Sequence, residues 1–244
     1  MLNPPFQHIH DFNAYGFEHL TILVTFIIAG ILFIKRTKNF SKHKQRFYLL
    51  ALCAILTILQ LLKIPVNILL ATFDKTTDLP FHLCNFLPLI LFVAFYLEKR
   101  IIWATSFFWI ILGTSQSNFT PTVTESLFHY DAIRYWLNHT ILVILALYPL
   151  FRWKWKIFHK DVWSSFLWLN IIAALIYFIN SQLGSNYLYI MEKPPGTTFF
   201  TILPEWPIYI LYLEVILIIW SYMLYGIYLL ILTFSLPQQR HNIQ

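Results

Sequence analysis

The first apolar stretch of the chain is Phe17–Ile34, FEHLTILVTFIIAGILFI, and it ends directly before Lys35-Arg36. As a helix rising about 1.5 Å per residue, this stretch is about 27 Å long, close to the thickness of a bilayer's hydrocarbon layer. The rest of the chain has the same character, because 58% of its 244 residues are hydrophobic and only 11% are charged. That composition excludes an ordinary soluble domain and predicts an all-α membrane protein.

Seven segments of this kind are expected to form one bundle, as a single domain over residues 1–244. They are Phe17–Ile34, Phe47–Leu70, Leu79–Leu97, Ile101–Ser117, Tyr135–Phe151, Val162–Ser181 and Pro207–Leu232. Each approaches or exceeds the roughly 20 residues that a membrane-spanning helix needs. The sequence therefore predicts a polytopic protein of the cell membrane with seven transmembrane helices.

Lysine and arginine are distributed unevenly between the two sets of loops. Thirteen lie on one set: Lys35, Arg36, Lys38, Lys42, Lys44, Arg46, Lys99, Arg100, Arg152, Lys154, Lys156, Lys160 and Arg240. The opposite set has three: Lys75, Arg134 and Lys193. Because cytoplasmic loops collect positive charge, the N-terminus is expected outside and the C-terminus in the cytoplasm. The net charge of +6 is thereby explained, and no nucleic-acid partner is expected.

Polar residues inside the seven segments concentrate near their outer ends. They are Glu18, His19, His82, Cys84, Asn85, Gln116, Ser117, Asn138, His139, Asn180 and Glu214. The second segment adds a stripe at helical spacing, made of Thr57, Gln60, Lys63 and Asn67. Polar groups are costly in hydrocarbon, so such a layer indicates a site. Since the inner halves are apolar, we expect a pocket that opens to the outer leaflet rather than a through-pore.

Cys84 and His139 are the candidate nucleophile and base of this polar layer. A thiol becomes a good nucleophile beside a base, and His139 lies at a matching depth on another segment. Both residues also have a structural interpretation, because buried cysteines are usually inert and intramembrane histidines often join helices. His82 is a rival base, but it is expected to point away from Cys84 and to make a hydrogen bond within the bundle, since residues two apart on a regular helix face different sides. An irregular segment start, which Pro80 would allow, would remove that expectation. Asn138 either orients the imidazole or makes a packing contact.

Lys63 would carry an expensive charge at its depth, so we expect a carboxylate partner, Glu214 or Glu18. That pair is interpreted as a structural ion pair that shapes a head-group pocket. Glu18 and His19 are either interfacial residues without a function or supporting residues of the site, and their place in the polar layer favours the supporting role. The outer loop at residues 182–206 is either a lid over the pocket or a plain connection.

Cys53 and Cys84 are the two cysteines of the chain, and they are placed near opposite membrane faces. A disulfide needs Cα atoms within about 7 Å, so these two are not expected to pair. The sequence has no CxxC or HxxxH spacing, and we expect neither a metal site nor a cofactor. The sequence specifies no oligomeric state.

The segment Leu79-Pro80-Phe81-His82-Leu83-Cys84-Asn85 resembles the L-P-x-H-x-C-N motif of the YwaF-type bacterial integral membrane proteins. These proteins are similar to the animal transmembrane protein 164 family. Further matches follow in family order: Phe17-Glu18-His19-Leu20, Gly113, Gln116, Thr120-Pro121, Trp136-Leu137-Asn138-His139, Asn186-Tyr187, Lys193-Pro194 and Pro204-Glu205-Trp206-Pro207-Ile208-Tyr209. The resemblance covers most of the chain and implies a fold of seven helices.

The animal relatives are described as acyltransferases that move fatty acyl chains between phospholipids. The resemblance implies that Cys84 is the nucleophile and His139 the base. More distant relatives, the androgen-induced fatty-ester hydrolases, use Thr and His in the analogous roles. The chain departs from the family pattern at Ser117-Asn118-Phe119 and at Leu188-Tyr189, which alters the rim of the predicted pocket.

Three hypotheses follow from these observations. In the first, an acyl-cysteine forms at Cys84 with membrane lipids as donor and acceptor, Gln116 or Asn138 stabilises the oxyanion, and His19, Lys63 and Glu214 hold the head group. In the second, the same polar layer binds a solute in a transporter or receptor-like protein. In the third, the chain is an assembly partner of another membrane protein.

Overall fold

The computed structural model describes residues 6, 8, 10–194 and 199–235. Arg240 and residues 195–198 of the outer loop named above lie outside the described residues. Within the described part of the chain the regular structure is helical, and the one strand-like pairing is an isolated bridge between Asp11 and Glu125.

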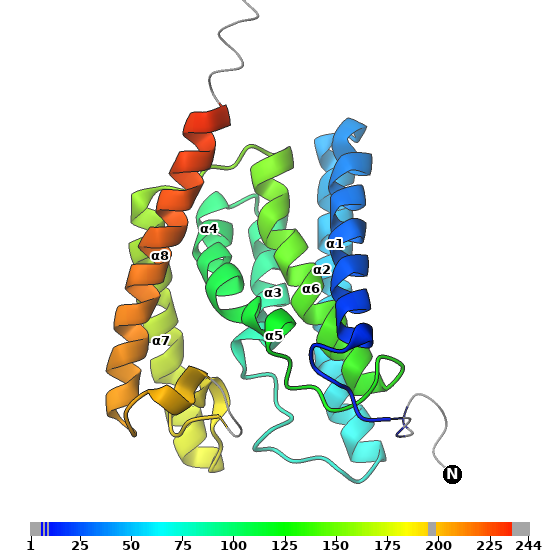
Figure 1. Ribbon diagram of the computed structural model, residues 1–244, viewed down its shortest axis with the longest axis vertical. Helices are drawn as coiled ribbons and strands as arrows, with labels where there is room; N and C mark the ends of the chain where they lie inside the picture. Colours follow the sequence, from blue (N-terminus) through cyan, green and yellow to red (C-terminus); the bar gives the residue numbers. More distant parts are fainter. Residues whose placement is uncertain (1–5, 7, 9, 195–198, 236–244) are drawn as a thin grey trace, which may run out of the picture.

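Helices run back and forth between the two ends of the molecule (Figure 1). In chain order they are α1 (Phe17–Arg36), η1 (Thr37–Asn39), α2 (Lys42–Leu69), α3 (Leu83–Tyr96), α4 (Arg100–Phe108), η2 (Trp109–Thr114), α5 (Gln116–Phe119), α6 (Tyr130–Arg152), α7 (His159–Leu183), η3 (Tyr187–Tyr189), η4 (Phe199–Ile202) and α8 (Ile208–Ser235). The connections α1–α2, α3–α4 and α6–α7 lie at one end, which is uppermost in Figure 1. The connections α2–α3, α5–α6 and α7–α8 lie at the opposite end with the start of α1.

Four segments are long and apolar enough to cross a membrane: Phe17–Asn39, Lys42–Leu69, His159–Leu183 and Ile208–Phe234. They mark the chain as a membrane protein. Helix α3 is apolar but shorter, and its 14 residues extend about 21 Å. The predicted third span began at Leu79, but the helix begins at Leu83, after four residues that are not helical. Pro80 contributes to this, since proline restricts the residue before it to extended conformations.

The predicted fourth span, Ile101–Ser117, is not one continuous α-helix. Helix α4 changes at Trp109 into the π-helical turn η2, and the short α5 follows. The Ser115 amide marks the change, because it donates to the Ile110 carbonyl five residues back at 2.8 Å. Such wide turns in otherwise α-helical segments frequently occur at functional sites.

The core lies where α3, α4 and α6 meet, and indole hydrogen bonds join these helices to their neighbours. The Trp103 indole donates to the Ala146 carbonyl of α6 at 3.0 Å. The Trp109 indole donates to the Ser165 carbonyl of α7 at 3.1 Å. Interhelical hydrogen bonds and close packing hold membrane helices together, because lipid is as apolar as the side chains.

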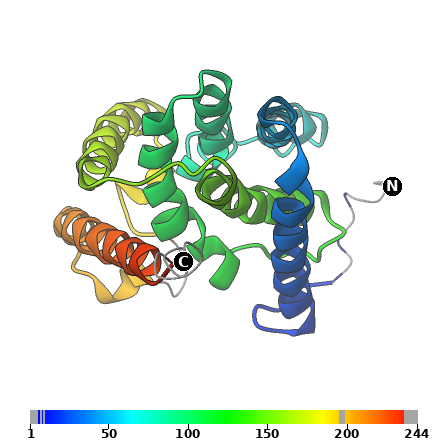
Figure 2. The same cartoon turned by 90° about the horizontal axis from the view of Figure 1, so that it is seen from above.

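Helices α7 and α8 form one side of the bundle, and α1 lies on the opposite side (Figure 2). Apolar side chains of α8 are largely exposed, for example Leu211, Val215 and Met223. A helix with an apolar outer surface is what contact with lipid chains requires.

Candidate functional site

Cys84 is the second residue of α3, and its neighbour His82 is the extended residue that caps this helix. The Cys84 side chain is half-buried, whereas Cys53 is fully buried in the core. The Cys84 sulfur lies 3.6 Å from the Asn85 side-chain oxygen. The position at a helix N-terminus brings the positive end of the helix dipole near this side chain.

Asn138 ties α6 to the backbone of Cys84. Its side-chain Nδ2 donates to the Cys84 carbonyl at 2.9 Å. The sequence had suggested that Asn138 orients the histidine beside it or makes a packing contact, but this amide holds the backbone of the candidate nucleophile. Asn138 directly precedes His139. One turn of α6 therefore carries both the residue that bonds the Cys84 backbone and the candidate base.

His139 is 6% exposed, and its two ring nitrogens have different environments. Nδ1 lies 2.8 Å from the Tyr135 carbonyl, which can only accept a hydrogen bond. In neutral His139, Nδ1 therefore carries the proton and Nε2 keeps the lone pair that a base needs. The Asn118 side chain fixes this turn of α6, because its Nδ2 donates to the His139 backbone carbonyl at 3.2 Å. Among the described contacts, no hydrogen bond joins His139 to Cys84.

The other two histidines of the polar layer accept at Nδ1. For His19, the Tyr15 amide donates to Nδ1 at 3.0 Å and Nε2 donates to the Asn118 carbonyl at 2.8 Å. Both nitrogens are used, so His19 fastens the start of α1 to the end of α5. For His82, the Leu188 amide lies 3.4 Å from Nδ1. His82 thus contacts the outer loop. Because residue 82 is extended and lies outside the helix, the helical-spacing argument for its direction does not apply.

The outer loop folds against the segment that leads into α3. The Tyr187 hydroxyl accepts from the Leu79 amide at 3.0 Å and donates to the Lys75 carbonyl at 2.8 Å. The ring of His82 packs 5.1 Å from the ring of Tyr189. Burial, and to a smaller extent the charge of Cys84, raises the pKa of the Tyr189 phenol. This part of the loop therefore packs against the segment that leads into α3 rather than serving only as a connection.

Leu188 and Tyr189 have positive φ angles of 61° and 53°. Residues other than glycine rarely adopt this conformation, so it persists only where the surroundings hold it. Asn180 provides part of that support, because its side chain bonds the Tyr187 backbone at both the amide and the carbonyl, at 2.9 Å each. The rim that departs from the family pattern is thus fixed by hydrogen bonds.

The partner of Lys63 is Asp78, at 2.7 Å, and neither Glu214 nor Glu18. The expectation of a Glu partner was wrong because the loop after α2 turns back and places Asp78 beside the helix. Asn67 donates to the same carboxylate at 2.9 Å. Burial by itself raises the pKa of Asp78, but hydrogen bonds from Asn67 and Lys63 outweigh burial and hold the pKa below its ordinary value.

The two glutamates instead make separate contacts. Glu214 accepts from Asn170 at 3.0 Å and so joins α8 to α7. Glu18 accepts from the Leu127 amide at 2.6 Å. Gln116 has an exposed side chain at the start of α5 and does not share the buried environment of His139. These placements argue against a head-group role for Glu214 and an oxyanion role for Gln116.

Arg134 is the site residue that the sequence interpretation missed, because it was counted only as a charge at a segment boundary. It donates to Gln60 Oε1 at 2.7 Å and to Asp131 at 3.3 Å. Within the described part of the chain, three buried polar atoms here have no hydrogen-bond partner: the donors Arg134 Nε and Gln60 Nε2 and the acceptor Asn138 Oδ1. Buried polar atoms are nearly always paired, so these three atoms are available to a polar ligand.

Asn118 was likewise missed as a supporting residue. The signal was a polar residue at the end of an apolar segment, in the run that departs from the family pattern. Among the described residues, no group of three His, Cys, Asp or Glu side chains is placed to hold a metal ion.

Residues 14–225 match the TMEM164 family. The chain belongs to the TMEM164 family. An uncharacterized protein of Treponema pallidum (strain Nichols) is 26% identical over 117 residues, which are 48% of this chain and 49% of that relative. The chain therefore spans about half the length of this curated relative. No solved structure matches the chain.

Proposed function

We propose that this member of the TMEM164 family is a membrane-embedded acyltransferase that moves a fatty acyl chain between phospholipids through an acyl-cysteine. Cys84 is the nucleophile and His139 the general base. The observation that carries the proposal is the 2.9 Å hydrogen bond from Asn138 to the Cys84 carbonyl. This bond links the backbone of Cys84 to Asn138, which directly precedes His139. Because His139 Nδ1 bonds the Tyr135 carbonyl, His139 Nε2 is free to accept a proton.

In the first half-reaction, His139 Nε2 takes the proton of the Cys84 thiol, and the thiolate attacks the ester carbonyl of a donor phospholipid. The ester C–O bond then breaks, and the imidazolium returns the proton to the departing lysophospholipid oxygen. The acyl group remains on Cys84 as a thioester. Forming this intermediate splits one difficult transfer into two easier steps.

In the second half-reaction, the hydroxyl of another lysophospholipid gives its proton to His139 and attacks the thioester. The thioester bond between the Cys84 sulfur and the acyl carbon breaks, and the leaving thiolate recovers the proton from the imidazolium. Water in place of the lysophospholipid would give a hydrolase. Both steps need the thiol to turn from Asn85 toward His139, and catalytic hydrogen bonds often close only when substrate is bound.

Arg134 and Gln60, in place of Gln116, are proposed to stabilise the negative charge that develops on the oxygen of the ester carbonyl. Their donors Nε and Nε2 are buried and have no partner among the described residues. Fixed donors aimed at an oxyanion are usually the largest single contribution to acyl-transfer catalysis. Lys63, held by Asp78, adds a second positive charge on the side where a phosphate head group would lie.

The proposal includes seven membrane crossings, with the N-terminus outside and the C-terminus in the cytoplasm of a cell membrane. The positive-inside distribution of lysine and arginine supports this orientation. It places Cys84 near the outer leaflet, away from cytosolic acyl-CoA. Membrane phospholipids are therefore the proposed donor and acceptor.

The test is acyl transfer in proteoliposomes that contain a donor phospholipid with an isotope-labelled acyl chain and a lysophospholipid with a different head group. We expect labelled acceptor phospholipid with wild type and with Cys53→Ala, a control that removes the other thiol. Cys84→Ala and His139→Ala should each lower transfer by at least about a hundredfold. Full transfer by Cys84→Ala would overturn the proposal, and solute uptake retained in Cys84→Ser would support the transporter alternative.

A further inference from the structure

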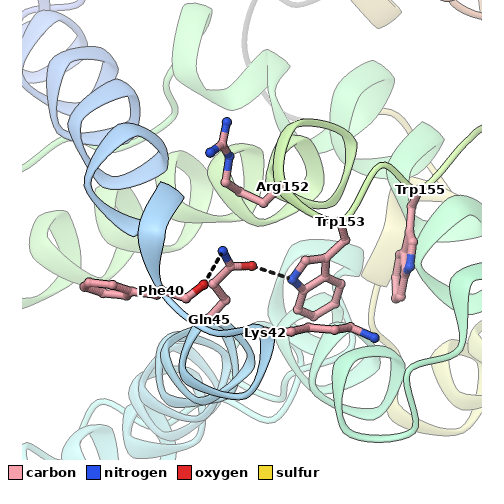
Figure 3. Close-up of a pocket in the computed structure, with 6 residues that line it drawn as sticks. All are labelled: Phe40, Lys42, Gln45, Arg152, Trp153 and Trp155. Atoms are coloured by element: carbon pink, nitrogen blue, oxygen red, sulfur yellow. Dashed lines mark hydrogen bonds between the residues drawn. The ribbon is translucent and has the colours of Figure 1, made fainter.

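A cavity lies at the end of the bundle opposite Cys84, between the start of α2 and the segment after α6. Its volume is about 410 Å³, and its lining is made of Phe40, Lys42, Gln45, Arg152, Trp153 and Trp155. Figure 3 shows Arg152 and Lys42 on different sides of the Trp153 ring, with Trp155 beyond it. Two cations and three aromatic rings around a cavity can receive an anion attached to an apolar group.

The cavity wall is held in place by Gln45. Its Nε2 donates to the Phe40 carbonyl at 3.2 Å and to the Thr37 carbonyl at 3.0 Å, and its Oε1 accepts from the Trp153 indole at 3.0 Å (Figure 3). The Trp153 and Trp155 rings pack with centroids 5.0 Å apart. With its amide fully used, Gln45 shapes the wall and leaves ligand binding to the cations.

This end of the molecule is strongly positive. Twelve lysines and arginines of the described residues lie there, against two carboxylates, Glu98 and Asp161. Both carboxylates are already paired: Glu98 with Lys42 and Arg46, and Asp161 with Arg100 at 2.6 and 2.9 Å. The acids of this end therefore leave most of its positive charge without a counter-charge from the protein.

Arg152 is the unpaired cation of the cavity. Among the described residues it makes no ion pair, and its buried Nε has no hydrogen-bond partner there. The guanidinium is planar and matches the geometry of phosphate oxygens. Lys42 lies in the first turn of α2, where the positive end of the helix dipole also favours an anion.

We propose that this cavity binds a phosphate group, with Arg152 as its main contact and the rings of Trp153 and Trp155 against the attached apolar part. Two sources carry such a group: the phosphodiester of an anionic lipid head group and a soluble phosphate. The site is separate from Cys84, which lies near the other end of α3. It does not depend on the acyl-transfer proposal.

The test uses the full chain in phosphatidylcholine nanodiscs, with native mass spectrometry to count bound ligand. One arm titrates phosphatidylglycerol into the nanodisc, and the other adds inorganic phosphate. Arg152→Gln is compared with Lys38→Gln, which removes an equal charge from an exposed residue at the same end and outside the cavity lining. We expect Lys38→Gln to bind like wild type and Arg152→Gln to bind about fivefold to tenfold more weakly.

Arg152-dependent binding of phosphatidylglycerol alone would identify a lipid head group as the source, and equal dependence for inorganic phosphate would identify a soluble anion. Equal binding by Arg152→Gln and Lys38→Gln in both arms would overturn the proposal. Where Arg152→Gln fails to fold, Arg152→Lys replaces it, since it keeps the charge and loses the planar donor set. It should then bind about twofold to threefold more weakly, and wild-type binding by this variant would overturn the proposal.

Discussion

Replacing Asp78 with Asn should destabilise the protein, because the Asp78 carboxylate receives three short charge-assisted hydrogen bonds at the base of the loop that leads to Cys84, and a longer one from the Thr77 hydroxyl at 3.4 Å. Lys63 contacts Oδ1 at 2.7 Å, while Asn67 and the Asp74 amide contact Oδ2 at 2.9 and 2.8 Å. An Asn side chain can keep its oxygen at the Oδ2 position for the last two donors. Its NH2 group then faces the Lys63 ammonium, and because both groups are donors, no hydrogen bond forms between them.

The cost follows from the burial of the pair, since the Asp78 and Lys63 side chains are 6% and 19% exposed. Hydrogen bonds to charged groups contribute about 1.5–3 kcal/mol, and neutral ones about 0.5–1.5 kcal/mol. Losing the Lys63 bond and weakening the other two therefore costs about 3 kcal/mol. For a chain of this size, that lowers the melting temperature by roughly 6–12 °C.

The assay is thermal unfolding of purified protein in one detergent, followed by tryptophan fluorescence. The matched control is Asp74→Asn, an exposed carboxylate in the same loop whose side chain bonds only Thr76 among the described contacts. The control should shift the midpoint by no more than about 2 °C, as expected for a surface substitution. Equal midpoints for Asp78→Asn and Asp74→Asn would refute the assigned role of Asp78.

Three further predictions concern Asp78, Asn138 and Glu214. Because the pKa of Asp78 is lowered by folding, its stabilisation is complete above the unfolded pKa of about 3.9 and is lost as pH falls below it; wild type should therefore lose its advantage over Asp78→Asn below about pH 4, and a constant gap would contradict this. Asn138→Ala removes the hydrogen bond to the Cys84 carbonyl and should cost about 1–2 kcal/mol in unfolding and slow acylation about tenfold; unchanged acylation would show that the bond does not position the thiol. Glu214→Gln keeps the contact with Asn170 and should change stability by less than about 1 kcal/mol; a larger loss would indicate a charged partner for Glu214.

The sequence predicted the helical segments well where the physics is local. A run such as Phe17–Ile34 must satisfy its backbone within a helix in lipid, and α1 begins at the predicted residue. Periodicity also placed Gln60, Lys63 and Asn67 on one face of α2, where all three bond groups outside the helix. Depth along the segments placed His139 at the level of Cys84, and the structure bonds the preceding residue, Asn138, to the Cys84 carbonyl.

What the sequence did not predict depends on the path of the loops and on hydrogen-bond register. Asp78 precedes the predicted third span by one residue, and only the path of the loop after α2 brings it to Lys63. The π-helical turn η2 has apolar composition like its surroundings, so nothing in residue type announces the Ser115 to Ile110 hydrogen bond. Arg134 was overlooked because a charge at a segment boundary is usually solvated, whereas this one is turned toward Gln60.

Intact-protein mass spectrometry tests the central claim most directly, because the proposed intermediate is covalent. Purified wild type is incubated with mixed phospholipids, quenched in acid and compared with Cys84→Ala, His139→Ala and the control Cys53→Ala. The account predicts one added fatty-acyl mass on wild type and on Cys53→Ala, with the modified residue identified as Cys84 by peptide mapping. An acyl mass that persists on Cys84→Ala, or absence of both adduct and lysophospholipid with wild type, would contradict it.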